Sequence, residues 1–161
     1  MKTADVIIVG SGASGLFNAL FLPQDYKVIV ITKKEVEESD SFLAQGGISA
    51  LKNPEDYDSY FEDTLKAGHY ENDKGAVEKM IKESPQIIHD LKDFGVRFDL
   101  KDGEIEFTRE GGHSTFRILH HEDLTGKEIT SHLYEEAKKR DNITIMENCT
   151  MIDIIEKDGE W

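Results

Sequence analysis

The sequence predicts an α/β fold of the Rossmann type, built on a parallel sheet, and three features near its N-terminus predict it. Residues 5–9, DVIIV, are the short, β-branched apolar run expected of a strand buried on both faces. A glycine-rich turn follows, and then a segment whose apolar residues recur at helical spacing: Phe17, Leu20 and Phe21. Residues 27–32, KVIVIT, form a second buried strand, which completes a βαβ unit with parallel strands.

The composition disfavours some classes of binding partner. The 161 residues include 19 basic and 33 acidic ones, a net charge of −14, which disfavours nucleic acids and anionic membranes as partners. The apolar runs are too short to span a bilayer, and the N-terminus lacks a signal-peptide pattern. The single cysteine, Cys149, excludes an internal disulfide. Together these features predict a cytoplasmic location.

The middle of the chain is predicted to be mostly helical. Asn53-Pro54 supplies a capping residue and a proline at the first position of a helix. A second helix follows, and Ser84-Pro85 is expected to interrupt it and restart the chain as a third. Residues 95–118 are predicted to form short strands and turns, with Asp102-Gly103 as a hairpin turn.

The last part of the chain opens with a capping-box pattern, Thr125 followed by Glu128, which predicts the start of a helix. Residues 142–155 are expected to form a third strand or a pair of strands, with residues 143–147 parallel to the first two. Asp158-Gly159 is a turn signal after a strand, but no returning strand follows it. We therefore expect the chain to be a piece of a longer protein.

The turn after the first strand matches the pattern G-x-G-x-x-G, and we expect all six residues to bind a cofactor: Gly10, Ser11, Gly12, Ala13, Ser14 and Gly15. The pattern is weak alone, but a buried strand before it and a helix after it are typical of dinucleotide binding. Gly10 would allow the tight turn, Gly12 the approach of a pyrophosphate, and Gly15 the close packing of helix on strand. A purely structural glycine turn is the alternative.

The end of the second strand disfavours an ordinary NAD site. An acidic residue there usually holds the ribose hydroxyls. This chain has Thr32, Lys33 and Lys34 at that place, with Glu35 beyond them. Lys33 is instead expected to contact the nucleotide through its backbone or its aliphatic stem, with a solvated surface lysine as the alternative.

The segment SFLAQGGISA, residues 41–50, places a glutamine and two glycines between apolar residues. After such a βαβ unit, it resembles the family of FAD enzymes that includes succinate dehydrogenase, fumarate reductase and L-aspartate oxidase. In that family the A-Q-G-G-I stretch lies along the flavin, where a Cβ on either glycine would block the approach of the ring. The resemblance implies cofactor contacts along this stretch: Asp40, Ser41, Phe42, Leu43, Ala44, Gln45, Gly46 and Gly47. A glycine-rich surface loop is the alternative.

Two later segments extend the resemblance over essentially the whole chain. Residues 109–129, REGGHSTFRILHHEDLTGKEI, resemble the family block in which a D-x-T-G run precedes a long helix. Thr150 and Met151 match the strand whose backbone contacts the adenosine. The resemblance therefore implies an incomplete FAD-binding domain, residues 1–161, whose capping and C-terminal domains and catalytic residues lie outside this chain.

Residues at two places in the chain distinguish the branches of this family. Membrane-complex members carry a histidine before the A-Q-G-G block that bonds FAD covalently, whereas this chain has Asp40, which implies non-covalent FAD. The run REGGHS resembles the L-aspartate oxidase branch, because dehydrogenases tend to have glutamine in place of His113. Glu110 would then match the carboxylate that orients the α-ammonium of the substrate. An exposed loop carboxylate is the alternative for Glu110.

The resemblance implies FAD-dependent oxidation of L-aspartate to iminoaspartate, with oxygen or fumarate as the acceptor, at the start of NAD biosynthesis. Quinolinate synthase is then a candidate partner. Two alternatives stay open: a soluble fumarate reductase-like flavoprotein, and a non-catalytic nucleotide-binding module. No metal site is expected, because His120-His121 with Glu122 and Asp123 fits no metal-ligand spacing.

Overall fold

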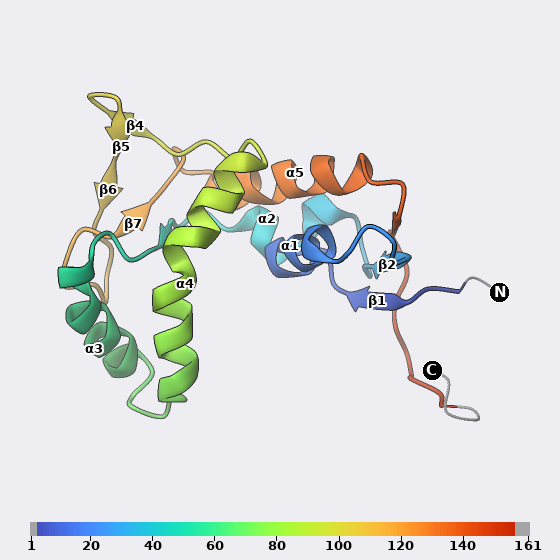
Figure 1. Cartoon of the computed structure of the whole chain (residues 1–161), viewed down its shortest axis with the longest axis horizontal. Coiled ribbons are helices and arrows are strands. Elements are labelled where there is room, and N and C mark those ends of the chain that lie inside the picture. Colours follow the sequence, from blue (N-terminus) through green and yellow to red (C-terminus); the bar gives the residue numbers. More distant parts are fainter. Residues whose placement is uncertain (1–2, 157–161) are drawn as a thin grey trace. The chain divides into compact units, whose positions relative to one another are not determined.

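The computed structural model describes residues 3–156, and the contacts within it divide the chain into two compact units. Unit 1 joins the residues up to Ala44 to those from Ile129 onward, and unit 2 consists of Gln45–Glu128. Each unit has its own strands and its own buried apolar cluster, and Figure 1 labels most of the elements of both. Among the residues described, no helix combines the length and the apolar character needed to cross a bilayer.

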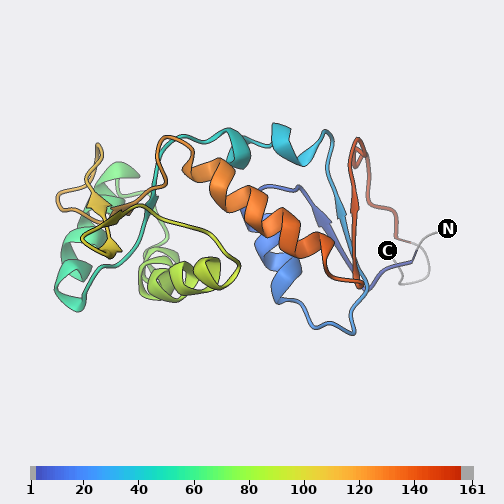
Figure 2. The ribbon, with the colours of Figure 1, turned by 90° about the horizontal axis from the view of Figure 1, so that it is seen from above.

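Unit 1 is built on a parallel three-stranded sheet in the order β1-β2-β8 (Figure 2). Strand β1 (Val6–Val9) pairs with β2 (Val28–Ile31), and β2 pairs in turn with β8 (Ile143–Met146). The three predicted strands are therefore confirmed, as is their parallel arrangement. The helices of this unit are α1 (Ala13–Phe21), η1 (Val36–Glu38), α2 (Asp40–Leu43) and most of α5 (Thr125–Lys138).

Helix α1 packs on one face of this sheet through a small apolar cluster that contains Ala19, Val28 and Val30. Strand β2 is buried, as predicted. Strand β1 is not, because Ile7 and Val9 are 60% and 54% exposed. Exposure alternates along β1, so one face of this strand is open, and the prediction of a strand buried on both faces is wrong there.

One further prediction for unit 1 is corrected by the structure, and one apolar residue of α1 is not buried. Phe21, at helical spacing with Phe17 and Leu20, is 55% exposed and stacks on Phe17 with ring centroids 4.5 Å apart. The strand or strand pair predicted over residues 142–155 is limited to β8. The backbone of Asn148 has a φ of 54°, a left-handed conformation that cannot continue a strand. The predicted turn at Asp158-Gly159 lies outside the described residues.

Unit 2 combines helices with two small antiparallel sheets. The helices are η2 (Pro54–Asp56), α3 (Tyr57–Ala67) and α4 (Lys74–Asp93). One sheet has the order β3-β7-β6, with β3 (Ile48–Ser49), β7 (Ile118–Leu119) and β6 (Phe107–Thr108). The other is a hairpin of β4 (Leu100–Lys101) and β5 (Glu104–Ile105). The predicted turn of this hairpin is confirmed, with φ angles of 55° at Asp102 and 87° at Gly103.

Helices α3 and α4 lie side by side and share the buried cluster of unit 2 (Figure 1). Tyr60 and Leu65 come from α3, and Val77 and Ile81 come from α4. Asn53 caps the turn before α3 with its side-chain oxygen, as the sequence predicts. The two helices therefore form the packed core of unit 2.

Helix α4 runs unbroken through the position where the sequence predicts a restart. Pro85 has no N–H to donate to the carbonyl of Ile81, one turn earlier. The hydroxyl of Ser84 donates to that carbonyl instead, at 2.7 Å, and also accepts the N–H of Leu51 at 2.8 Å. The predicted break is therefore wrong, because a neighbouring side chain replaces the missing backbone bond.

Helix α5 starts at Thr125, but not through the predicted capping box. The Thr125 hydroxyl accepts the N–H of His121 at 3.1 Å, and the N–H of Glu128 donates to the carbonyl of Leu124 at 2.9 Å. Thr125 is therefore already inside the helix and does not cap it. The inward face of the helix is as predicted and consists of Ile129, Leu133 and Ala137.

Replacement of Ser84 by alanine should lower the free energy of unfolding by about 1–3 kcal/mol, because two buried backbone groups would lose their partner. Denaturant unfolding of the purified protein measures this change. Glu83→Ala, at the neighbouring exposed position, is the control and should shift stability by less than about 0.5 kcal/mol. Similar effects for the two variants would show that Ser84 does not replace the missing bond of Pro85.

Candidate functional site

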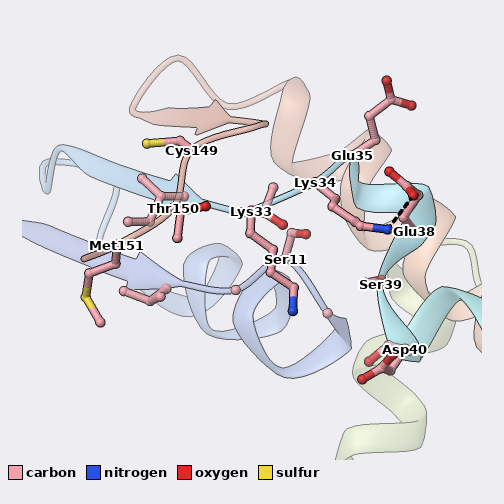
Figure 3. A pocket seen from close by; sticks show the side chains of 16 residues that line it. Ser11, Lys33, Lys34, Glu35, Glu38, Ser39, Asp40, Cys149, Thr150 and Met151 are labelled. Carbon is pink, nitrogen blue, oxygen red and sulfur yellow. Dashed lines mark hydrogen bonds and ion pairs between the residues drawn. The ribbon is translucent and has the colours of Figure 1, made fainter. Parts of the chain in front are cut away.

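A pocket of about 450 Å³ lies at the carboxyl ends of the strands of unit 1 (Figure 3). Ligands of open α/β sheets bind at this place, and the volume is in the range of cofactor sites. Four segments form its walls: residues 9–12, 31–35, 38–41 and 149–151.

The glycine turn after β1 brings α1 close to this pocket. Gly10 has a φ of 111°, a conformation that a residue with a side chain adopts only with strain. A Cβ on Gly15 would collide with the carbonyl oxygen of Gly10, so the helix approaches the turn as closely as the two backbones allow. A Cβ on Gly12 would lie 2.7 Å from the hydroxyl of Ser41, another pocket residue. The geometry thus agrees with the tight turn predicted at Gly10 and the close packing predicted at Gly15.

The start of α1 is suited to an anion. Its cap residue is Gly12, which has no side chain to bind the first N–H groups, and the first turn contains no acidic residue. The first N–H groups and the positive end of the helix dipole are therefore suited to a phosphate. The hydroxyl of Ser11, which is 2% exposed, has no hydrogen-bond partner among the described atoms. A bound phosphate would satisfy this buried hydroxyl, which otherwise costs free energy.

Charged side chains of the segment after β2 form another wall of the pocket. Lys33 extends its side chain into the pocket (Figure 3). Lys34 and Glu38 form an ion pair at 2.9 Å, which raises the pKa of the lysine and lowers the pKa of the glutamate. Because both groups are exposed, this pair contributes little to stability. Glu35 and Asp40 also line the pocket, so the wall is acidic as well as basic.

The pocket collects about half of the residues predicted to bind the cofactor: Gly10, Ser11, Gly12, Lys33, Asp40, Ser41, Thr150 and Met151. The remaining residues of unit 1 do not line it: Ala13, Ser14, Gly15, Phe42, Leu43 and Ala44. Three belong to unit 2: Gln45, Gly46 and Gly47, and so does Glu110, the predicted substrate contact. Sequence reasoning missed other lining residues, which a position after a parallel strand or beside α2 could have indicated: Thr32, Lys34, Glu35, Glu38, Ser39 and Cys149.

The two glycines of the A-Q-G-G stretch lack side chains for different reasons. A Cβ on Gly47 would collide with the side chain of Ile118 and lie 2.5 Å from the carbonyl oxygen of Leu119, both on β7. A Cβ on Gly46 would meet only the carboxylate of Glu110, at an ordinary contact distance of 3.7 Å. The packing of the protein explains Gly47, whereas the surface beside Gly46 is open.

Glu110 lies in the loop between β6 and β7 and is exposed. Its Oε1 accepts a hydrogen bond from the N–H of Gly47 at 3.1 Å. Its Oε2 is the atom nearest to the open side of Gly46. The structure thus brings the predicted substrate contact together with both glycines of the A-Q-G-G stretch.

A buried arginine, which the sequence reasoning did not single out, fastens this loop to the helix α3 region. Arg117 is 0% exposed, and its guanidinium binds both oxygens of Asp56, at 2.8 and 2.9 Å. It also binds Asp63 at 2.6 Å. Asp63 in turn accepts the N–H and the hydroxyl of Ser114, each at 2.7 Å. No local pattern in the sequence links Arg117 to these carboxylates, which are 61 and 54 residues away.

These contacts keep both carboxylates charged. The hydrogen bond from Arg117 holds the pKa of Asp56 at about 2, below its ordinary value of 3.8. Burial raises the pKa of Asp63, but hydrogen bonds from Ser114 and Arg117 outweigh burial and leave that pKa lowered. Hydrogen bonds to the two carboxylates raise the pKa of Arg117. The cluster therefore stays ionised at neutral pH.

The histidine pair after β7 contacts carboxylates. The Nδ1 atom of His120 lies 3.0 Å from Asp99. His121 lies 3.5 Å from Asp99 and 3.7 Å from Glu128. Asp99 also accepts the N–H of Glu122 at 2.9 Å.

Comparison with known protein families agrees with the pocket and the glycine turn. The model of the family described as FAD binding domain matches residues 5–161. The chain therefore belongs to the family of FAD binding domains, and FAD is its cofactor.

The relatives with this sequence pattern include L-aspartate oxidases. The chain is 45% identical over 153 residues to that of Clostridium perfringens, which covers 95% of this chain and 35% of the relative. It is 46% identical over 156 residues to that of Clostridium acetobutylicum, which covers 96% of this chain and 36% of the relative. The chain thus spans about a third of the length of these curated relatives.

Solved structures of the same family confirm the predicted fold class. A mutant of E. coli quinol fumarate reductase FrdA matches with a TM-score of 0.89 and 25% identity, over 97% of this chain and 28% of that one. The Mycobacterium smegmatis Sdh1 complex in the apo form matches with a TM-score of 0.84 and 28% identity, over 97% and 29%.

Replacement of Gly12 by valine should abolish FAD retention, because the side chain would fill the pocket wall where the start of α1 faces the ligand. The ratio of flavin absorbance to protein absorbance after purification of the full-length protein measures retention. Gly75→Val, at an exposed position in the first turn of α4, is the control and should keep its FAD. A yellow, stoichiometric Gly12→Val protein would contradict the assignment of the pocket.

The lowered pKa of Asp56 predicts a pH dependence of stability. A folded-state pKa of about 2 against 3.8 means that folding favours the charged form. The stabilisation is complete above about pH 4 and is lost as the pH falls toward about 2, a change of about 2 kcal/mol. Asp56→Asn cannot titrate, so its free energy of unfolding should depend less steeply on pH over this range. Urea unfolding between about pH 5 and 2 tests this, and equal slopes for the two proteins would refute it.

Proposed function

We propose that this chain is the N-terminal FAD-binding part of an L-aspartate oxidase, which oxidises L-aspartate to iminoaspartate with oxygen or fumarate as acceptor. The observation that carries the proposal is the contact of the Glu110 carboxylate with Gly47, beside the open Gly46. The identity of 45% and 46% to two L-aspartate oxidases supports it.

The pocket of unit 1 is proposed to hold the dinucleotide part of FAD. The buried hydroxyl of Ser11 and the start of α1 suit its pyrophosphate, and the Lys33 side chain adds a positive charge. Thr150 and Met151 form the wall assigned to the adenosine. Asp40 stands where a covalent attachment would need a histidine, so FAD is proposed to be bound non-covalently. Bound FAD supplies the hydride acceptor of the reaction.

Glu110 is proposed to read the charge of the substrate. L-aspartate carries an α-ammonium that succinate and fumarate lack, and a carboxylate beside it makes a charge-assisted hydrogen bond. The same carboxylate offers no advantage to a dicarboxylate without the ammonium, so it gives selectivity. The groups that hold the substrate carboxylates are proposed to lie in the part of the relatives that this chain does not span.

A soluble fumarate reductase-like flavoprotein is the second candidate. The TM-score of 0.89 to the E. coli quinol fumarate reductase FrdA mutant supports it. The position of Glu110 favours the oxidase, because a fumarate reductase has no ammonium to bind.

We also propose a cytoplasmic location and a partner reaction that consumes iminoaspartate, as quinolinate synthase does in NAD biosynthesis. The net charge of −14 supports the location, because anionic membrane surfaces repel such a chain. The instability of an imine in water supports rapid transfer of the product to the next enzyme.

Replacement of Glu110 by glutamine in the full-length enzyme should lower kcat/KM for aspartate by roughly 10–150-fold. The charged hydrogen bond that it removes is worth about 1.5–3 kcal/mol. Steady-state oxidation of aspartate measures this loss. Fumarate reduction by the same variant should be nearly unchanged, because fumarate has no ammonium.

Fumarate reduction is therefore the internal control for fold damage. Equal losses on both substrates would make Glu110 structural. Unchanged rates on both would remove the main argument for the oxidase over the fumarate reductase.

A further inference from the structure

The guanidinium of Arg117 has five N–H groups, and each one faces a partner. Nε donates to Asp56 at 2.9 Å, and Nη2 donates to Asp56 at 2.8 Å and to Ser59 at 2.7 Å. Nη1 donates to Asp63 at 2.6 Å and reaches Nδ1 of His113 at 3.1 Å. Arginine has no acceptor atom, so Nδ1 of His113 is the acceptor, and the ring proton of a neutral His113 is on Nε2.

Because all five N–H groups of Arg117 face a partner, this cluster differs from a solvated ion pair on the surface. Arg117 is fully buried, its charged group lies 4.8 Å from the ring centre of Tyr60, and its carboxylate partners are 8% and 16% exposed. Burying such charges costs free energy unless the geometry is well matched, so the cluster requires its partners to lie at fixed positions. The planar fork of arginine matches five fixed partners, and a lysine ammonium has only three N–H groups.

The cluster holds the loop that carries Glu110 at several points. Besides Arg117 itself, Ser114 binds Asp63, and the hydroxyl of Thr115 binds Asp56 at 2.7 Å. The N–H of His113 donates to the carbonyl of Glu110 at 3.3 Å, which closes a tight turn. Glu110 is thus tied through a short turn to residues that are themselves bound to the helix α3 region.

Gly47, which donates its N–H to Glu110, is also held by residues next to Arg117. Strand β7 begins at the next residue, Ile118, and Ile118 and Leu119 form the wall against which Gly47 packs. One short stretch therefore fixes both Gly47 and the loop whose carboxylate accepts its N–H.

We propose that Arg117 is a positioning residue for Glu110. By fixing residues 113–117 on the helix α3 region, it sets where the Glu110 carboxylate lies against Gly46 and Gly47. The consequence for aspartate rests on the proposed function, whereas the positioning itself is a property of unit 2.

Amide hydrogen exchange in the full-length, FAD-loaded enzyme tests the positioning without any turnover. Arg117→Lys keeps the charge but cannot serve five partners, so the amides of Ser114 and Gly47 should both exchange at least about tenfold faster. Glu110→Ala should accelerate Gly47 but not Ser114. Arg97→Lys is the matched control, since Arg97 is 72% exposed and binds Glu128, and it should change neither amide. Faster exchange at Ser114 with an unchanged Gly47 amide would overturn the proposal.

A double-mutant cycle tests the consequence for the substrate. Arg117→Lys should lower kcat/KM for aspartate by about tenfold, mainly through KM, while fumarate reduction stays within about twofold. In the Glu110→Gln background, Arg117→Lys should have no further effect on aspartate. Additive losses, or equal losses on both substrates, would mean that Arg117 only supports the fold.

If Arg117→Lys does not fold, Asp63→Asn gives the same test in milder form, because it keeps an acceptor for Ser114 but weakens the hold on the guanidinium. The two experiments also separate the hypotheses. Coupled exchange of Ser114 and Gly47 without aspartate oxidation would sink the proposed function and leave the positioning role intact.

Discussion

The site of unit 1 depends on one contact, in which the backbone of α1 touches the backbone of the turn after β1. The N–H of Gly10 still donates to Ile31 at 2.8 Å, so the strand pairing continues up to the turn. The helix must therefore begin at once, and it does so because Gly15 has no Cβ to strike the carbonyl of Gly10. This close approach aims the start of α1 at the pocket and leaves Ser11 buried beside it.

In unit 2, side-chain contacts rather than close backbone packing hold the candidate site residues in place. Its predicted contacts lie on loops, which hold their shape poorly unless side chains fix them. A fully buried guanidinium with two carboxylates supplies that fixation, and the low pKa of Asp56 shows how strongly the charged form is favoured. Rigid positioning of binding groups by supporting contacts is a general requirement of precise sites.

The parts of the structure that the sequence predicted correctly have local signals. The strands around Ile7 and Ile29 and the turn at Gly10 follow from short apolar runs and glycine spacing, which neighbouring residues determine. The wrong predictions depend on distant residues. Ser84, which replaces the missing hydrogen bond at Pro85, also accepts the N–H of the distant Leu51. The exposure of Ile7 depends on which parts of the chain pack on that face of β1.

The candidate site divides in the same way. The glycine pattern and the A-Q-G-G stretch were identified as motifs, and eight of the predicted residues line one pocket. Arg117 was missed because its partners Asp56 and Asp63 are 61 and 54 residues away, and an isolated arginine reads as exposed. The contact between Glu110 and Gly47 joins residues 63 positions apart, which no local pattern reveals.

The two adjacent glycines of the A-Q-G-G stretch differ in what constrains them and when. A side chain at Gly47 strikes β7, so the chain itself rejects it while folding, before any cofactor is present. A side chain at Gly46 meets no backbone, so the fold tolerates it, and under the proposed function its effect would appear only when the ligand binds. Random mutations at these neighbouring codons would therefore fall into separate classes, one defined by loss of protein yield and the other by loss of binding in a well-folded product.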